Sequence, residues 1–145
     1  METLQTTSHS LSDRQWAAGA HVAALAAALV TSWIAGVAGA LGALAVWMLV
    51  RDRSSFAADH AKEAVNFNLS MFIYMCIAVV LGFLLVGVTV VTLGIGALLT
   101  VPAGFVLLLA VCGLAILWLV CSLIAVFKAY DGQAYRYPLT IRLFR

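Results

Sequence analysis

The longest feature of the chain is an uncharged, mostly apolar block at residues 64–127. These 64 residues contain no Asp, Glu, Lys, Arg or His, and most of them are Leu, Val, Ile, Ala, Gly or Phe. A helix on the surface of a soluble domain needs a polar face for water, and this block offers none. Because one crossing of a bilayer takes roughly 20 mainly apolar residues, the block predicts at least two transmembrane helices.

A second apolar block, residues 15–50, has no formal charge and contains one histidine, His21. One straight helix over this block would be about 54 Å long, whereas the hydrocarbon core is about 30 Å thick. The block therefore predicts a hairpin of two short helices. Glycines at positions 36, 39 and 42 weaken a helix, so we expect the break between residues 36 and 42. The same small residues would let helix backbones approach closely.

The complete pattern predicts an all-α integral membrane bundle of four transmembrane helices arranged as two hairpins, with three helices as the alternative. We expect helices at about residues 15–34, 38–50, 60–88 and 102–130, within a single transmembrane domain at residues 14–142. The second hairpin would be connected around residues 89–102, with Pro102 in the first turn of the last helix. A polar N-terminal tail at residues 1–13 and a C-terminal tail at residues 131–145 complete the chain.

The charged residues predict how the chain is oriented. The basic residues form three clusters separated by the two apolar blocks. With two hairpins, all three clusters lie on one face, which the positive-inside rule makes cytoplasmic. The pattern thus predicts a multi-pass protein of the bacterial inner membrane with both termini in the cytoplasm. A single crossing by the first block would instead place Arg14 opposite the other basic residues.

The same composition limits the classes of partner and chemistry. No basic cluster is dense enough to indicate nucleic acid as a partner. Three cysteines, an odd number, all lie inside apolar blocks, which indicates packing rather than disulfides or metal binding. The bilayer itself is therefore the first expected partner, followed by another membrane protein or further copies of the chain. The sequence points to no known small-molecule ligand.

The most informative polar residues lie at the start of the third expected helix. Four residues share one face at helical spacing: Asp59, Glu63, Asn66 and Ser70. Ser54 or Ser55 could cap this helix. An amide that faces lipid is costly, so Asn66 should face protein or water, and Asn68 should meet another helix. The stripe would run from the headgroups into the hydrocarbon.

We interpret this stripe first as a group of contacts that hold helices together. Asn66 could bond to His21 or to backbone on the first hairpin, and Glu63 could pair with Arg136. His21 is intramembrane and ionisable, which favours a functional role by default, but a lone neutral histidine more often bonds a neighbour. An alternative is a cytoplasm-facing vestibule that binds a polar segment of a partner or substrate.

Two chemical alternatives depend on the same helical turn. Asp59, His60 and Glu63 could bind a metal, but no second histidine supports such a site. Glu63 or Asp59 could act as a base to His60, but no serine or cysteine nucleophile stands in a recognisable motif. We therefore predict a protein that is not an enzyme and that carries no metal or cofactor.

Two polar motifs resemble those of a known family. The motifs are residues 59–68, which read DHAKEAVNFN, and residues 129–139, which read AYDGQAYRYPL. They resemble the Tic-twenty-like family, small bacterial membrane proteins similar to the twenty-kilodalton subunit of the chloroplast inner-envelope import translocon. The likeness covers roughly residues 12–142. The positions that match the family pattern are Asp59, His60, Lys62, Glu63, Asn66, Phe67, Asn68, Tyr135, Arg136, Tyr137 and Pro138.

This resemblance implies an inner-membrane protein linked to protein translocation through partner subunits. Our leading hypothesis is a non-enzymatic structural or interaction component whose cytoplasmic polar residues form the contact surface. The alternative is a small channel or transporter subunit that acts as a homo-oligomer. The candidate residues for either role are His21, Asp59, His60, Lys62, Glu63, Asn66, Asn68, Tyr135, Arg136 and Tyr137.

Overall fold

The computed structural model describes residues 9–31 and 35–144 and contains four α-helices and no strand within them. The helices are α1 (Leu11–Thr31), α2 (Ala35–Val50), α3 (Ser55–Val91) and α4 (Ala97–Tyr130). Each begins three to five residues before the expected start, at residues 11, 35, 55 and 97 instead of 15, 38, 60 and 102. The prediction of an all-α chain with four helices is confirmed.

Side-chain caps explain two of these starts. Ser10 Oγ accepts a hydrogen bond from the Asp13 backbone N–H, and the Asp13 carboxylate accepts from the Ser10 N–H. This reciprocal pair satisfies two free donors at the start of α1. At α3, Ser54 adopts an extended backbone and its hydroxyl accepts from the Ala57 N–H, as expected for an N-cap.

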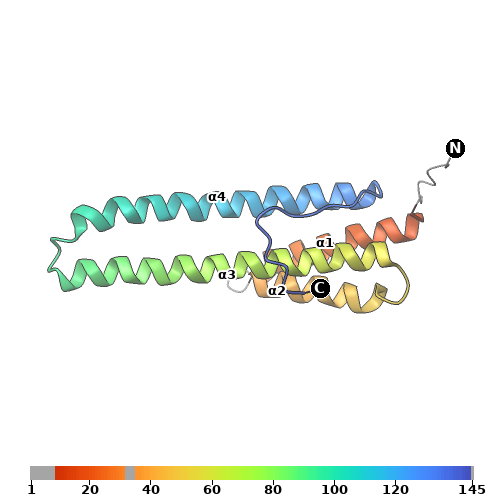
Figure 1. Ribbon diagram of the computed structural model, residues 1–145, viewed down its shortest axis with the longest axis horizontal. Coiled ribbons are helices and arrows are strands. Elements are labelled where there is room, and N and C mark those ends of the chain that lie inside the picture. The colour runs from red at the N-terminus through yellow and green to blue at the C-terminus, as the bar shows by residue number, and fades with distance from the viewer. Residues whose placement is uncertain (1–8, 32–34, 145) are drawn as a thin grey trace.

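The four helices are unequal in length, and this gives the molecule two halves. α1 and α2 have 21 and 16 residues, whereas α3 and α4 have 37 and 34. The short helices lie beside the N-terminal half of α3, and the far halves of α3 and α4 continue beyond them as a hairpin (Figure 1). Arg14 near the start of α1 donates a hydrogen bond to the Tyr130 carbonyl at the end of α4. The start of α1 and the end of α4 therefore lie at the same end of the molecule.

The glycines of the first apolar block do not form its break, so that expectation was wrong. α1 ends at Thr31 and α2 begins at Ala35, and the three glycines lie inside α2. A Cβ at Gly36 would lie 2.7 Å from Phe72 Cβ on α3, and one at Gly42 would lie 2.8 Å from the Ala23 carbonyl on α1. Small residues thus let α2 approach two helices closely, as their spacing predicted.

Pro102 also lies elsewhere than expected. It is inside α4, because the helix begins five residues earlier, at Ala97. The connection between α3 and α4 is short, and it contains Leu93 and Gly94, which both have positive φ. Glycine adopts that conformation without steric cost, whereas a leucine in it is strained.

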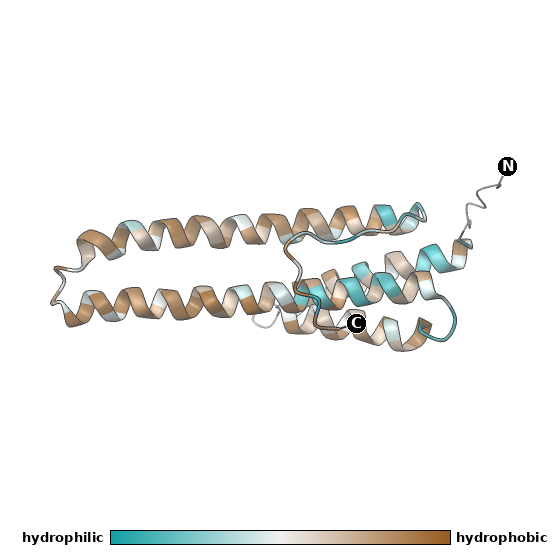
Figure 2. Ribbon diagram, in the orientation of Figure 1, coloured by the Kyte–Doolittle hydropathy of each residue, from teal (hydrophilic) through white to brown (hydrophobic). Residues whose placement is uncertain are grey.

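Among the helices that the structure describes, only α3 and α4 are long and apolar enough to span a membrane, and α2 is a shorter apolar helix. The apolar side chains in the far halves of α3 and α4 are exposed, as Phe83 (73%) and Leu98 (82%) illustrate. A core helix of a soluble protein would bury such residues. Figure 2 shows hydrophobic residues along the projecting hairpin and hydrophilic residues gathered at the opposite end. The structure thus supports two crossings and does not establish the predicted four.

Candidate functional site

A buried chain of three polar side chains lies at the hydrophilic end of the molecule. His21 of α1 lies between His60 of α3 and Tyr137, which belongs to residues 131–144 after α4, here called the C-terminal segment. All three side chains are at most 3% exposed. His21 Nε2 is 2.9 Å from His60 Nδ1, and His21 Nδ1 is 2.9 Å from the Tyr137 hydroxyl. Phe67 stacks on the Tyr137 ring with centroids 3.9 Å apart. We call His21, His60 and Tyr137 the buried triad.

The direction of these hydrogen bonds follows from the acidity of each group. Burial raises the pKa of Tyr137, so its hydroxyl keeps its proton. A phenol donates well and an imidazole nitrogen accepts well, so we assign Tyr137 as donor to His21 Nδ1. The His21 proton then lies on Nε2 and is donated to His60 Nδ1. The triad ties α1, α3 and the C-terminal segment together with no formal charge.

A row of α3 side chains holds the C-terminal segment along its length. Tyr74 donates to the Leu139 carbonyl (2.7 Å), and Ser70 Oγ accepts from the Ile141 N–H (2.8 Å). Asn66 makes two bonds of 2.7 Å with Phe144, accepting from its N–H and donating to its carbonyl. Glu63 completes the row through a 3.1 Å ion pair with Arg142. We call Glu63, Asn66, Ser70 and Tyr74 the α3 ladder.

The ladder differs from the predicted contacts in two respects. Asn66 bonds to Phe144 at the end of the chain, not to His21 or the first hairpin. Glu63 pairs with Arg142, not with Arg136. Both differences arise because the C-terminal segment folds back onto α3, which helical periodicity does not reveal. Asp59, on the same stripe, lines the pocket beside Glu63 and pairs with Lys62 at the surface, with 3.9 Å between Asp59 Oδ1 and Lys62 Nζ.

Asn68 meets other helices, as expected. Its Oδ1 accepts from the indole N–H of Trp118 on α4 (3.1 Å), and its amide donates to the Ala64 carbonyl (2.9 Å). The residue is 1% exposed and lies against Gly39 of α2. Asn68 therefore joins α2, α3 and α4 through contacts that a larger residue at position 39 would prevent.

Most of the predicted residues surround one polar pocket of about 490 Å³. α3 forms one wall and the C-terminal segment forms the other. The lining residues are Phe56, Asp59, His60, Lys62, Glu63, Asn66, Ala134, Tyr135, Arg136, Arg142 and Phe144. Burial, with a contribution from Cys121, raises the pKa of Tyr135 to about 12, so this hydroxyl stays neutral.

The structure identifies contributors that the sequence interpretation missed. Tyr74 lies four residues after Ser70 and continues the same stripe, so helical spacing could have found it. Residues 139–144 contribute mainly through their backbone, which leaves no pattern in the side chains. Conversely, Tyr137 was a candidate for the cytoplasmic contact surface, but it is 3% exposed and belongs to the core.

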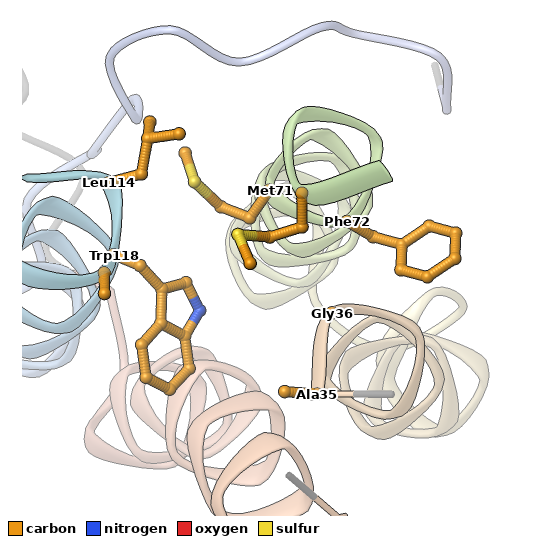
Figure 3. Close-up of a pocket in the computed structure, with 8 residues that line it drawn as sticks. Ala35, Gly36, Met71, Phe72, Leu114 and Trp118 are labelled. Atoms are coloured by element: carbon orange, nitrogen blue, oxygen red, sulfur yellow. The ribbon is translucent and has the colours of Figure 1, made fainter. Parts of the chain in front are cut away.

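A second, apolar cavity of about 230 Å³ lies between α2, α3 and α4 (Figure 3). Met71, Leu114 and Trp118 lie around it in the close-up, with Ala35 and Gly36 at the start of α2. Trp118 is the one ring donor among the described residues that line it, and its indole N–H bonds to Asn68. These lining residues offer hydrophobic contact.

Metal binding and acid–base chemistry were the two chemical alternatives for the start of α3. No group of three His, Cys, Asp or Glu side chains among them could hold a metal ion. His60 Nε2 and Glu63 Oε2 are buried and make no hydrogen bond to any described residue, although the Gln133 backbone lies near the His60 ring. The cysteines are free, with Cys76 and Cys112 exposed on the apolar helices and Cys121 buried.

The fold and the site define a class of protein: a helical membrane protein whose polar groups mostly bond to one another. The chain belongs to the magnetosome magnetite crystal formation protein family (MamF/MmsF), whose model matches residues 12–144. No curated protein and no solved structure matches the chain.

The family match corrects the resemblance drawn from the two polar motifs. The Tic-twenty-like assignment was wrong, because the magnetosome family is a different one. The expected link to protein translocation depended on that assignment and has no other support. A membrane location agrees with both the family and the two long apolar helices.

Proposed function

We propose that the protein is a non-enzymatic component of the magnetosome membrane that contributes to magnetite crystal formation through protein contacts. The family match over residues 12–144 carries the magnetite part of this proposal. The contact surface would be the hydrophilic end of the molecule, where the polar pocket opens beside α3 and the C-terminal segment. α3 and α4 would anchor this end in the bilayer.

The non-enzymatic part of the proposal rests on how the polar groups are used. His21, Asn66, Asn68 and Ser70 are buried, and each makes a hydrogen bond within the chain. A general base or a pore lining needs polar groups that face a substrate or water. Groups already engaged in holding helices favour a structural role. The channel alternative therefore gains no support from the stripe that suggested it.

Deletion and complementation in a magnetite-forming bacterium test the role in crystal formation. We expect deletion to change the number or diameter of crystals seen by electron microscopy, and the wild-type gene to restore them. Unchanged crystals after deletion would contradict the proposal. Protein abundance in purified magnetosome membranes, measured by immunoblot, is needed to interpret each strain.

Two isosteric variants separate a structural from a catalytic role. Glu63→Gln keeps an acceptor for Arg142, and His60→Asn keeps an acceptor close to Nδ1, the ring nitrogen that faces His21, but neither can act as an acid or base near neutral pH. We expect both to restore crystals, with Asp52→Asn at an exposed position as the matched control. Loss of crystals with either variant, at normal abundance and stability, would indicate acid–base chemistry.

A further inference from the structure

The C-terminal segment reverses direction at a strained turn. Tyr137 is fixed by His21 and Phe67, and the chain then turns at Pro138 and Leu139 and returns along α3. Leu139 has φ +55°, in the left-handed region that a side chain disfavours. Opening this turn would release the strain while the buried triad stayed intact.

The segment beyond the turn, residues 139–144, is held by groups on α3 that a second copy of the chain would also supply. Asn66, Ser70 and Tyr74 bond to its backbone, and one ion pair, Arg142 with Glu63, adds a side-chain contact. The docked segment also turns apolar side chains outward at alternate positions. Leu139, Ile141 and Leu143 are 62%, 39% and 56% exposed. A neighbouring molecule would cover this row.

We propose that residues 139–144 exchange between two copies of the chain, each segment docking on the α3 ladder of the other. Strained hinge turns favour such exchange because the opened form makes the same contacts without the strain. Because Tyr137 stays on its own copy and Leu139 docks on the other, two residue steps of about 7 Å in total span the gap, so the exchange requires the two copies to pack with their ladders facing each other. Copies in one membrane share depth and orientation, so ladder and segment meet at matching heights. This inference stands independently of the role in crystal formation.

Cross-linking between two tagged copies tests the exchange. The native cysteines at positions 76, 112 and 121 are replaced by alanine, and one copy carries Glu63→Cys while the other carries Arg142→Cys. Co-expressed in membranes and treated with a short bismaleimide, the pair should give a heterodimer. Replacing Glu63→Cys by Asp52→Cys, on the connection before α3, should remove it. A heterodimer of equal yield with both pairs would indicate random collision and would overturn the exchange.

Substitutions at the hinge give opposite expected shifts. Leu139→Gly removes the strain of the closed turn and should lower the fraction of heterodimer about fivefold. Leu139→Pro cannot adopt positive φ, so it should block the closed turn and raise that fraction. Thr140→Gly, one residue along, controls for added flexibility and should leave the yield within twofold. If each segment instead stays on its own copy and lipid covers its apolar side chains, neither Leu139 variant should change the heterodimer yield. That result would refute the proposal.

Discussion

At the scale of single residues, the buried triad is the contact that depends most on exact chemistry. His21 bonds both His60 and Tyr137, so its loss removes the hydrogen bonds that it makes to two buried polar atoms. An unsatisfied buried group costs about 1–3 kcal/mol, which is large compared with the stability of a small protein. The triad is therefore where a change of a few atoms should have the greatest effect.

We predict that Tyr137→Phe and His21→Phe each destabilise the protein, and that their effects are coupled. Tyr137→Phe removes one hydroxyl and should cost about 1 kcal/mol. Because both remove the same bond, the double variant should differ from the sum by about 0.5–3 kcal/mol. Thermal unfolding in detergent measures this, with Tyr130→Phe at an exposed ring as the control. Strictly additive effects would argue against a hydrogen bond between the two side chains.

We predict that Asn66→Leu leaves membrane insertion intact but loosens the C-terminal segment. Leucine removes both hydrogen bonds to Phe144, and we expect a loss of about 0.6–2 kcal/mol. The free segment should then be trimmed faster by carboxypeptidase, as followed by mass spectrometry. Thr140→Val, at a less buried position in the same segment, serves as the control. Equal trimming rates for wild type and Asn66→Leu would contradict the docking role.

At the scale of helices, small residues decide how closely α1, α2 and α3 approach. A Cβ at Gly39 would collide with the Asn68 amide and lie 3.0 Å from the Ala24 carbonyl, so no space remains for it. Asn68 cannot simply move away, because it also bonds to Trp118. Gly19 on α1, by contrast, has nothing within 4 Å of the same added atom.

These two glycines give a matched prediction. Gly39→Ala should destabilise the protein by about 1–3 kcal/mol through overpacking. Gly19→Ala should be neutral or stabilising by up to about 1 kcal/mol, because alanine favours helix where nothing blocks it. Thermal unfolding of both variants in the same detergent gives the comparison. A Gly19→Ala variant as unstable as Gly39→Ala would contradict the packing argument.

The sequence predicted the helices well and the contacts of the site less well. The lengths of the two apolar blocks and their lack of charge gave four helices, since both can be read from runs of neighbouring residues. The break of the first hairpin was misplaced because glycine weakens an isolated helix, whereas inside α2 it permits close packing. The partners of Asn66 and Glu63 could not be found, because residues 142–144 lie almost 80 positions away in the chain and bond mainly through backbone.

At the scale of the whole molecule, the charged residues gather at one end. The start of α1, the connection between α2 and α3, and the end of α4 lie there, while the connection between α3 and α4 lies at the other end (Figure 1). The chain that reaches this other end, within residues 64–127, carries no charged residue. This asymmetry is the basis for an orientation across the membrane.

We predict that reporter fusions at the N- and C-termini both report the cytoplasm. A fusion inserted after Gly94, in the α3–α4 connection, should report the opposite compartment, because one crossing by α3 separates it from the basic clusters. Paired alkaline phosphatase and green fluorescent protein fusions make the measurement. A periplasmic N-terminus with a cytoplasmic C-terminus would favour three crossings instead.

The unequal helix lengths have a consequence for the lipid that surrounds the protein. Four helices stand side by side at one end of the molecule, and only two continue to the other. In a bilayer such a body displaces more lipid from one leaflet than from the other, in the manner of a wedge. The bilayer around the protein is least stressed where the leaflet that holds the wide end is stretched. In a small, strongly curved vesicle, the stretched leaflet is the one on the convex side.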